Sequence, residues 1–416
     1  MSTAPGHAMN SFASLQPETL LTSTGRDPAA YGGYVNTPAF RGSTILASSY
    51  EDWEASKQGD NPYRNYGRYG SPTTRALEAA VAELEGGYRA QVFPSGLSAC
   101  THALMAFLSC GDHVLIADNV YGPTRSFADH TLRRFGVEVS YFAPGIGAEI
   151  QSLMRPNTRL VFVESPGSLT FEVCDIPAIA QVTHANNAVV IADNSWASPL
   201  YFKPFAHGVD VSIQAATKYI LGHSDGLLGI VTCNQNTWER LQSSAHVFGE
   251  TAGPEEVYLA LRGLRTLSVR LKQHWQNGLM LAQQLALHPA VAQVLHPALP
   301  GAPGHEIWQR DFLGATGLFA IVLNSAAPEI LPCFFRELKL FGIGLSWGGF
   351  ESLALPVGTP VRSATPWAQQ GHLIRIHAGL ENVEDLISDM TSALDHIHTP
   401  QHKTKMACAE AQATSA

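Results

Sequence analysis

The sequence has little of what marks nucleic-acid-binding, membrane or secreted proteins. Only 15% of its 416 residues are charged, the formal net charge is -9, and there is no long run of Lys or Arg, so we expect no nucleic-acid partner. No apolar stretch is long enough to cross a bilayer, and the N-terminal residues lack the basic and apolar regions of a secretory signal. We therefore expect a cytoplasmic protein without membrane contact.

Common cofactor and disulfide signatures are missing as well. None of the six cysteines stands in a Cys-x-x-Cys pair, which favours reduced thiols without a disulfide framework. No Gly-x-Gly-x-x-Gly follows a predicted strand and no Gly-x-x-x-x-Gly-Lys-Ser/Thr occurs, so a nicotinamide dehydrogenase or a nucleotidase is disfavoured. We expect no metal site.

The apolar pattern predicts an N-terminal arm and a large α/β domain. Residues 1–65 are rich in Gly, Pro and aromatic residues, with room for one short helix at most. In the large domain, residues 66–268, a helix over 71–85 comes first, with Ser71 as its cap. A second helix follows residue 96, with Leu97, Cys100, Leu104 and Leu108 on its apolar side. Short apolar runs predict buried strands at 90–93, 113–118, 137–142, 159–165, 188–194 and 210–216. Such strands, alternating with helices, indicate a mainly parallel sheet covered by helices.

A smaller α+β domain is expected over residues 269–398. A long helix over 266–289 leads out of the large domain, and strands are predicted near 316–323 and 373–378. The last helix follows Asn382, which suits its N-cap. We expect residues 399–416 to be disordered.

Polar residues follow the predicted strands, where parallel sheets bind ligands. They are Ser95 and Gly96, Tyr121, Asp193, and Thr217 with Lys218. Each residue type has an ordinary structural role, such as capping a helix or bonding a turn. A lysine directly after a buried strand is nevertheless costly unless it is paired or covalently used. The set as a whole suits pyridoxal phosphate, which needs a lysine amine, an acid beside its ring nitrogen, a phosphate cradle and a stacking ring.

The segment IADNSWASPLYFKPFAHGVDVSIQAATKYILGHSDGLLG (191–229) resembles the pyridoxal-phosphate enzymes of cysteine and methionine metabolism. The resemblance covers roughly residues 35–398 and is strongest to the bacterial cystathionine β-lyases, through QAATK, ESPGSLTFEV and SWGGFES. It implies the fold-type I architecture of aspartate aminotransferase. The tetrapeptide IADN occurs at 116–119 and again at 191–194. We expect Asp118 only to bond a turn, whereas Asp193 is functional.

The resemblance also implies a role for each matching residue. Lys218 would hold the cofactor covalently and move the substrate α-proton, and Asp193 would pair with the ring nitrogen. Tyr121 would stack on the ring and assist proton transfer. The phosphate would be bound by Ser95, Gly96, Leu97 and Thr217, and by Tyr66 and Arg68 of a neighbouring subunit. The substrate would contact Arg375, which suits its α-carboxylate because a guanidinium binds it with two parallel bonds, and also Ser346, Trp347 and Tyr66.

The implied activity is β-elimination of L-cystathionine to homocysteine, pyruvate and ammonia, a step of methionine biosynthesis. The implied assembly is a homotetramer, a dimer of dimers with shared active sites. Tyr69, Ser126 and Leu345 depart from the usual β-lyase pattern, all at the far end of the substrate. Three alternatives therefore stay open: a β-lyase for S-alkylcysteine or cystine, a γ-lyase or γ-synthase, and a non-catalytic binding protein on the same fold.

Overall fold

Two β-sheets organise the computed structural model, which describes residues 15–57 and 65–398. The larger sheet has seven strands in the order β1-β7-β6-β5-β4-β2-β3, and the smaller has four in the order β10-β11-β9-β8. The strands of the larger sheet are β1 (Arg89–Phe93), β2 (His113–Ala117), β3 (Glu138–Phe142), β4 (Thr158–Glu164), β5 (Val189–Asp193), β6 (Val211–Gln214) and β7 (Gly229–Cys233). Those of the smaller are β8 (Val291–Leu295), β9 (Leu318–Leu323), β10 (Leu353–Val357) and β11 (Leu373–His377).

The larger sheet is mainly parallel, as the sequence predicts. Strands β3, β2, β4, β5 and β6 pair in parallel, so their carboxyl ends share one edge of the sheet. Strand β7 runs antiparallel to both β6 and β1. Strand β7 is absent from the predicted strands, because no helix separates it from the preceding strand. It returns directly from the turn around Lys218, so the alternation of strands and helices stops there.

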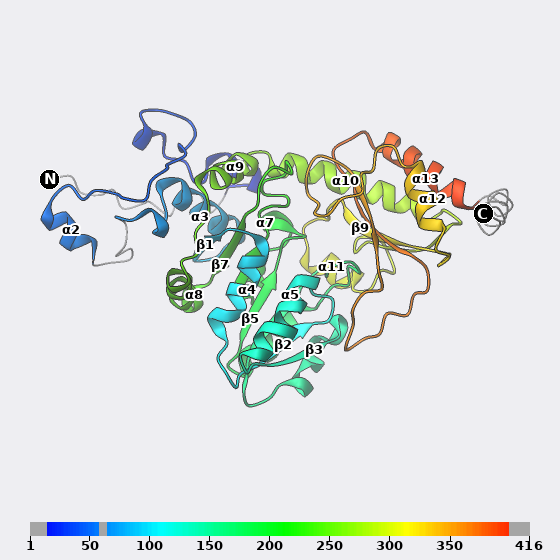
Figure 1. Cartoon of the computed structure of the whole chain (residues 1–416), viewed down its shortest axis with the longest axis horizontal. Helices are drawn as coiled ribbons and strands as arrows, with labels where there is room; N and C mark the ends of the chain where they lie inside the picture. The colour runs from blue at the N-terminus through cyan, green and yellow to red at the C-terminus, as the bar shows by residue number, and fades with distance from the viewer. Residues whose placement is uncertain (1–14, 58–64, 399–416) are drawn as a thin grey trace, which may run out of the picture.

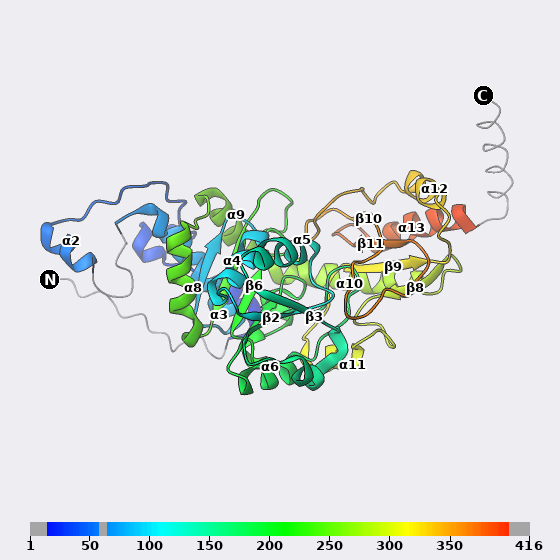
Figure 2. The same ribbon diagram turned by 60° about the horizontal axis from the view of Figure 1, so that its bottom comes forward.

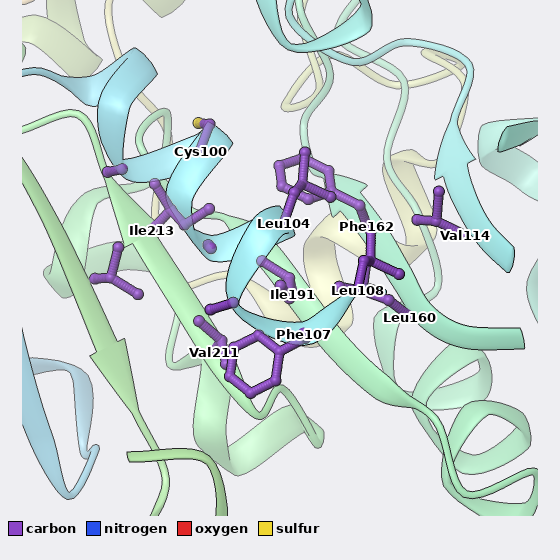
Figure 3. Close-up of a cluster of buried hydrophobic side chains, with 14 of the residues drawn as sticks. Cys100, Leu104, Phe107, Leu108, Val114, Leu160, Phe162, Ile191, Val211 and Ile213 are labelled. Carbon is purple, nitrogen blue, oxygen red and sulfur yellow. The ribbon is translucent and has the colours of Figure 1, made fainter. Parts of the chain in front are cut away.

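Helices cover both faces of this sheet (Figures 1 and 2). On one face, Cys100, Leu104 and Phe107 pack against Phe162, Ile191 and other strand side chains (Figure 3). Leu97 is exposed rather than part of this apolar face, because it lies in the first turn of the helix, beyond the strand ends. The helices around this sheet are α3 (Pro72–Glu85), α4 (Gly96–Phe107), α5 (Gly122–Ser126), α6 (Ile176–Ala185), α7 (Ser198–Tyr201), α8 (Gln235–Phe248) and α9 (Pro254–Leu264).

The predicted helix ends agree with the local chemistry. Ser71 Oγ accepts the N–H of Thr74 at 3.2 Å at the start of α3, and Gly86 ends that helix in the left-handed conformation at φ 79°. Asn382 Oδ1 accepts the N–H of Glu384 at 2.9 Å before the last helix. Both caps satisfy backbone groups that a helix leaves unpaired.

The smaller sheet is antiparallel and packs against the larger unit. Its helices are α10 (Leu267–Leu285), α11 (His305–Asp311), α12 (Ile330–Glu337) and α13 (Val383–His398). One buried cluster joins Trp196 and Phe202 to Phe312, Leu318 and other residues of the smaller unit. Strands β9 and β11 match the predicted strands, whereas β8 and β10 were missed. Strand β10 contains Pro356 and lies at the sheet edge, where a missing backbone donor is tolerated.

The N-terminal segment contains two short helices, α1 (Pro17–Ser23) and α2 (Tyr50–Ser56), where room for only one was predicted. Helix α2 lies apart from the two sheets (Figure 1). The tail expected to be disordered, residues 399–416, lies outside the described residues. Among the helices of the described residues, none combines the length and the apolar character that a bilayer crossing requires.

Leu104→Ala should lower the free energy of unfolding by about 2–5 kcal/mol, because Leu104 is fully buried between α4 and the sheet and its loss leaves a cavity. Urea unfolding at one protein concentration measures this. Leu287→Ala, at a side chain that is 80% exposed, is the control and should change stability by less than about 0.5 kcal/mol. Equal losses for the two variants would contradict the packing described.

Candidate active site

The predicted site residues gather where the carboxyl ends of the parallel strands face the smaller sheet. Asp193 is the last residue of β5, and Lys218 follows β6 after a short turn. Ser95 and Tyr121 are the N-cap residues of α4 and α5. The smaller unit contributes Arg375 from β11, and Ser346 and Trp347 from the loop before β10. The site therefore depends on how the two units pack.

The amine of Lys218 is buried and held by the smaller unit. Its Nζ donates to Ser346 Oγ at 2.6 Å and lies 5.3 Å from the ring centroid of Trp347. Burial, with a smaller effect from the charge of Arg375, lowers the pKa of Lys218 to about 8, while Asp193 opposes the shift. A large fraction of this amine is therefore neutral and nucleophilic near pH 8.

Asp193 has no basic side chain within salt-bridge distance among the described residues. Its carboxylate accepts the N–H of Ser195 at 3.0 Å, and the thiol of Cys100 lies 3.6 Å away. Burial raises the pKa of Asp193, whereas the Ser195 hydrogen bonds and the charge of Lys218 favour the anion. A buried carboxylate with so few donors suits a cationic ring nitrogen.

Glu164 is a second buried acid, opposite Asp193 in the pairing of β4 and β5. Its Oε2 accepts the N–H of Tyr121 at 2.6 Å, and Oε1 accepts the hydroxyl of Ser168 at 2.5 Å. Burial and the neighbouring Asp193 raise the pKa of Glu164. Two adjacent carboxyls do not both ionise readily, so the charge of Asp193 disfavours ionisation of Glu164.

Glu164 and Cys100 were not predicted as site residues. The only available signal for Glu164 was an acid at the end of a parallel strand, directly before the Ser-Pro-Gly turn. Tyr121 is 44% exposed while its backbone N–H is held by Glu164, so the residue is fixed but accessible to a ligand.

The start of α4 has the features of an anion-binding site. Ser95 Oγ accepts the N–H of Ser98 at 3.1 Å, so Ser95 caps the helix. Within the described residues, the N–H groups of Gly96 and Leu97 form no hydrogen bond, and they are available to an anion. A Cβ on Gly96 would lie 2.6 Å from Ala215 Cβ, so only glycine lets the helix approach this closely. The hydroxyl of Thr217 is engaged by the backbone of Leu228, donating at 3.2 Å and accepting at 2.9 Å.

The loop that carries Ser346 is fixed from two sides. Arg375 Nη2 donates to the carbonyl of Ser346 at 2.8 Å, and Gly348 donates its N–H to His377 Nε2 at 3.1 Å. Gly348 also packs on the backbone of Lys218, where a Cβ would lie 2.9 Å from the Lys218 carbonyl carbon. Ser346 has a φ of 72°, a strained conformation for a residue with a side chain. This arrangement places Ser346 between Lys218 and Arg375.

Tyr66 and Arg68 make their contacts elsewhere in this chain. The Arg68 guanidinium lies 5.3 Å from the ring of Tyr66 and 4.5 Å from the ring of Tyr69, and Tyr69 in turn contacts His246 of α8. Asp118 also differs from the expectation. It is not only a turn residue, because its buried carboxylate binds backbone N–H groups of residues 363–365.

Comparison with known proteins identifies the family. Residues 18–395 match the model of the Cys/Met metabolism PLP-dependent enzymes. The chain belongs to this family.

Several relatives of this family member cover nearly its whole length. It is 47% identical to a putative cystathionine beta-lyase of Rhizobium johnstonii, over 89% of this chain and 94% of that one. It is 42% identical to the cystathionine beta-lyase MetC of Escherichia coli, over 91% and 98%. An L-alanine/L-glutamate racemase of Wolbachia pipientis is 40% identical, over 94% and 100%. The crystal structure of metB from Corynebacterium glutamicum superposes with a TM-score of 0.85 at 30% identity, over 92% and 99%.

These comparisons confirm the predicted family, its α/β fold and its dependence on pyridoxal phosphate. The residues present fit that cofactor in three respects. In the part of the chain that the structure describes, Asp193 is a buried acid without a basic partner in salt-bridge contact, Lys218 has an amine of lowered pKa, and the first N–H groups of α4 are unbonded.

The rate at which cofactor-free protein binds added pyridoxal phosphate should rise with pH and level off above about 8. Only the neutral amine of Lys218 is nucleophilic, and burial lowers its pKa to about 8. The absorbance of the bound cofactor after rapid mixing measures this rate. Nα-acetyl-lysine, whose amine has a pKa of about 10.4, is the control for the pH dependence of the reagent itself. A rate that follows this control would contradict the assigned pKa.

Gly96→Ala should weaken cofactor binding by about tenfold or more, because the added methyl forces the start of α4 away from Ala215. Equilibrium titration of cofactor-free protein measures the Kd. Gly145→Ala is the matched control, since no atom lies within 4 Å of its added methyl. An unchanged Kd for Gly96→Ala would show that the start of α4 does not bind the cofactor phosphate.

Proposed function

We propose that the chain is a pyridoxal-phosphate-dependent carbon–sulfur β-lyase that converts L-cystathionine to homocysteine, pyruvate and ammonia. The observation that carries this proposal is the pair of contacts to Ser346. Lys218 binds its hydroxyl and Arg375 its carbonyl, so an amino acid whose carboxylate is held by Arg375 has its α-carbon near Lys218. The relatives from R. johnstonii and E. coli named cystathionine beta-lyase support the choice of reaction.

Each residue of the site has a proposed role in the reaction. Lys218 would hold the cofactor covalently through Nζ, and the same Nζ would remove the substrate α-proton. Bound pyridoxal phosphate supplies a ring that accepts the negative charge formed at the α-carbon. Asp193 stabilises the positive ring nitrogen, and Tyr121 stacks on the ring and assists proton transfer. The α4 start, Ser95 and Thr217 hold the phosphate, and Ser346 and Trp347 line the substrate.

The bond that breaks is the one between Cβ and sulfur. The sulfur leaves with a proton as the thiol of homocysteine, while the three-carbon remainder is hydrolysed to pyruvate and ammonia. Lys218 Nζ is the proton carrier on the side of the α-carbon, and its low pKa lets it accept and return a proton near neutral pH.

We also propose that the active site is shared between subunits of a cytoplasmic homotetramer, a dimer of dimers. The arm, residues 1–65, would reach a neighbouring subunit and bring Tyr66 and Arg68 to its phosphate and substrate. The domains would then be residues 66–268 and 269–398. The position of α2 apart from the sheets supports this assembly, as do exposed apolar side chains of the arm, such as Leu46 at 87% exposure.

A second candidate is amino-acid racemisation. The Wolbachia relative named L-alanine/L-glutamate racemase is 40% identical over nearly the whole chain. In this chain Leu345, directly before Ser346, is 82% exposed and offers no polar group to the distal amine and carboxylate of cystathionine. Ser126 and Tyr69 likewise supply no charge. The same groups that remove an α-proton would racemise an amino acid if the proton returned to the opposite face.

Purified protein with cofactor should release pyruvate from L-cystathionine with a higher kcat/KM than from cystine or S-methylcysteine. Release of 2-oxobutyrate would instead indicate γ-elimination, and conversion of L-alanine to D-alanine without pyruvate would indicate a racemase. Lys218→Ala should lose at least about 10³-fold in kcat, because it removes both covalent attachment and the α-proton carrier. Lys272→Ala, at a mostly exposed side chain, is the control and should keep full activity.

A further inference from the structure

Asp118 joins the two units of the molecule beside the active site. It follows β2, three residues before Tyr121, and its side chain is buried. Its carboxylate accepts the N–H groups of Ser363 at 2.8 Å, Ala364 at 2.8 Å and Thr365 at 3.0 Å. These donors belong to the segment that connects β10 to β11, residues 358–372, here called the strap. Three successive N–H groups on one carboxylate form an anion-binding turn.

Arg125 completes this contact. One Nη donates to both the carbonyl and the carboxylate of Asp118, and the other donates to Ser363 Oγ at 3.0 Å. Its guanidinium is buried and lies 3.7 Å from the ring centroid of Tyr141. Burial alone would raise the pKa of Asp118, but the strap N–H groups and Arg125 outweigh it and lower that pKa. The buried charges of Asp118 and Arg125 are therefore well compensated.

The strap has further anchors on the larger unit. Arg362 Nη2 donates to Glu172 Oε2 at 2.5 Å and also to Thr170 Oγ1. Trp367 packs against the buried cluster that joins the two units. In both ribbon views the orange strap region leaves the smaller sheet and reaches the β2–β3 side of the larger one (Figures 1 and 2). The strap has no helix or strand of its own, so these contacts define its position.

The strap leads directly into β11, which carries Arg375, whereas Asp118 leads directly into Tyr121. We propose that Asp118 is a positioning residue whose contact with the strap fixes Arg375 relative to Tyr121, and so sets the affinity of the site for the substrate α-carboxylate. The proposal rests on the roles proposed above for Tyr121 and Arg375. Misplacing a carboxylate-binding guanidinium by even an ångström weakens binding strongly.

The test is Asp118→Asn, which keeps the size of the side chain but places an NH2 group against N–H donors. Glycine is the probe, because it has no group to eliminate. Its Kd for the protein with bound cofactor, measured from the cofactor absorbance, should rise by about tenfold or more. With L-cystathionine, KM should rise by a similar factor while kcat falls less than about threefold. Amide hydrogen exchange of residues 358–372, measured without substrate, should accelerate.

Asp112→Asn is the matched control, because Asp112 accepts a backbone N–H from Ser109 at 2.7 Å at the opposite end of β2. It should leave the Kd for glycine and strap exchange unchanged. Arg125→Gln should reproduce part of the effect, and the double variant should be less than additive. Should Asp118→Asn not fold, Arg125→Gln carries the same measurements.

An unchanged Kd for glycine in Asp118→Asn, whether or not strap exchange accelerates, would overturn the proposal. If amide exchange of the strap were nevertheless faster in Asp118→Asn, Asp118 would hold the strap in place without positioning Arg375. Glycine binding does not depend on which reaction the enzyme catalyses. A wild-type protein that binds glycine but does not cleave cystathionine would refute the proposed function and leave this inference standing.

Discussion

The site depends on keeping two ionisable side chains, Asp193 and Lys218, buried at the ends of neighbouring strands. Burial disfavours the charged form of each, and neither has an ion-pair partner in contact among the described residues. The carboxylate accepts hydrogen bonds from a backbone N–H and a thiol, and the amine donates one to a hydroxyl. An arrangement with so little compensation is complementary to a cofactor that brings a cationic nitrogen and forms a covalent bond with the amine.

The smaller unit completes the site through close backbone contact. Gly348 lies against the backbone of Lys218, and Ser346 takes a left-handed conformation that places its hydroxyl on the lysine and its carbonyl on Arg375. His377 holds the same loop and lies two residues from Arg375 on β11. The strain at Ser346 persists because contacts on both sides determine it. The residues proposed to bind the substrate and those proposed to bind the cofactor are therefore in direct contact.

Sequence reasoning located the residues that follow strands, because a polar residue after a buried apolar run is visible locally. Asp193 and Lys218 were found in this way, as were Ser95 and Tyr121. Contacts that depend on register or on distant segments were not visible. Glu164 is significant only because β4 places it opposite Asp193, and Asp118 only because a segment about 245 residues later folds onto it. Leu97 fits the helical period but lies beyond the sheet, so periodicity alone misplaced it.

The residues that are visible locally in the sequence are those proposed to carry out the chemistry, whereas they do not determine which substrate is chosen. In the roles proposed above, Lys218 and Arg375 would act on groups that every α-amino acid possesses and Asp193 on the cofactor ring, so the three residues account equally well for a lyase or a racemase. What distinguishes these reactions lies beyond Cβ, where a leaving group must be recognised and held. The resemblance predicts that this region contains Leu345, Ser126 and, from the proposed neighbour, Tyr69, none of which carries a charge. If these residues face the distal end of the substrate, as we propose, they offer no fixed countercharge to the distal amine and carboxylate of cystathionine.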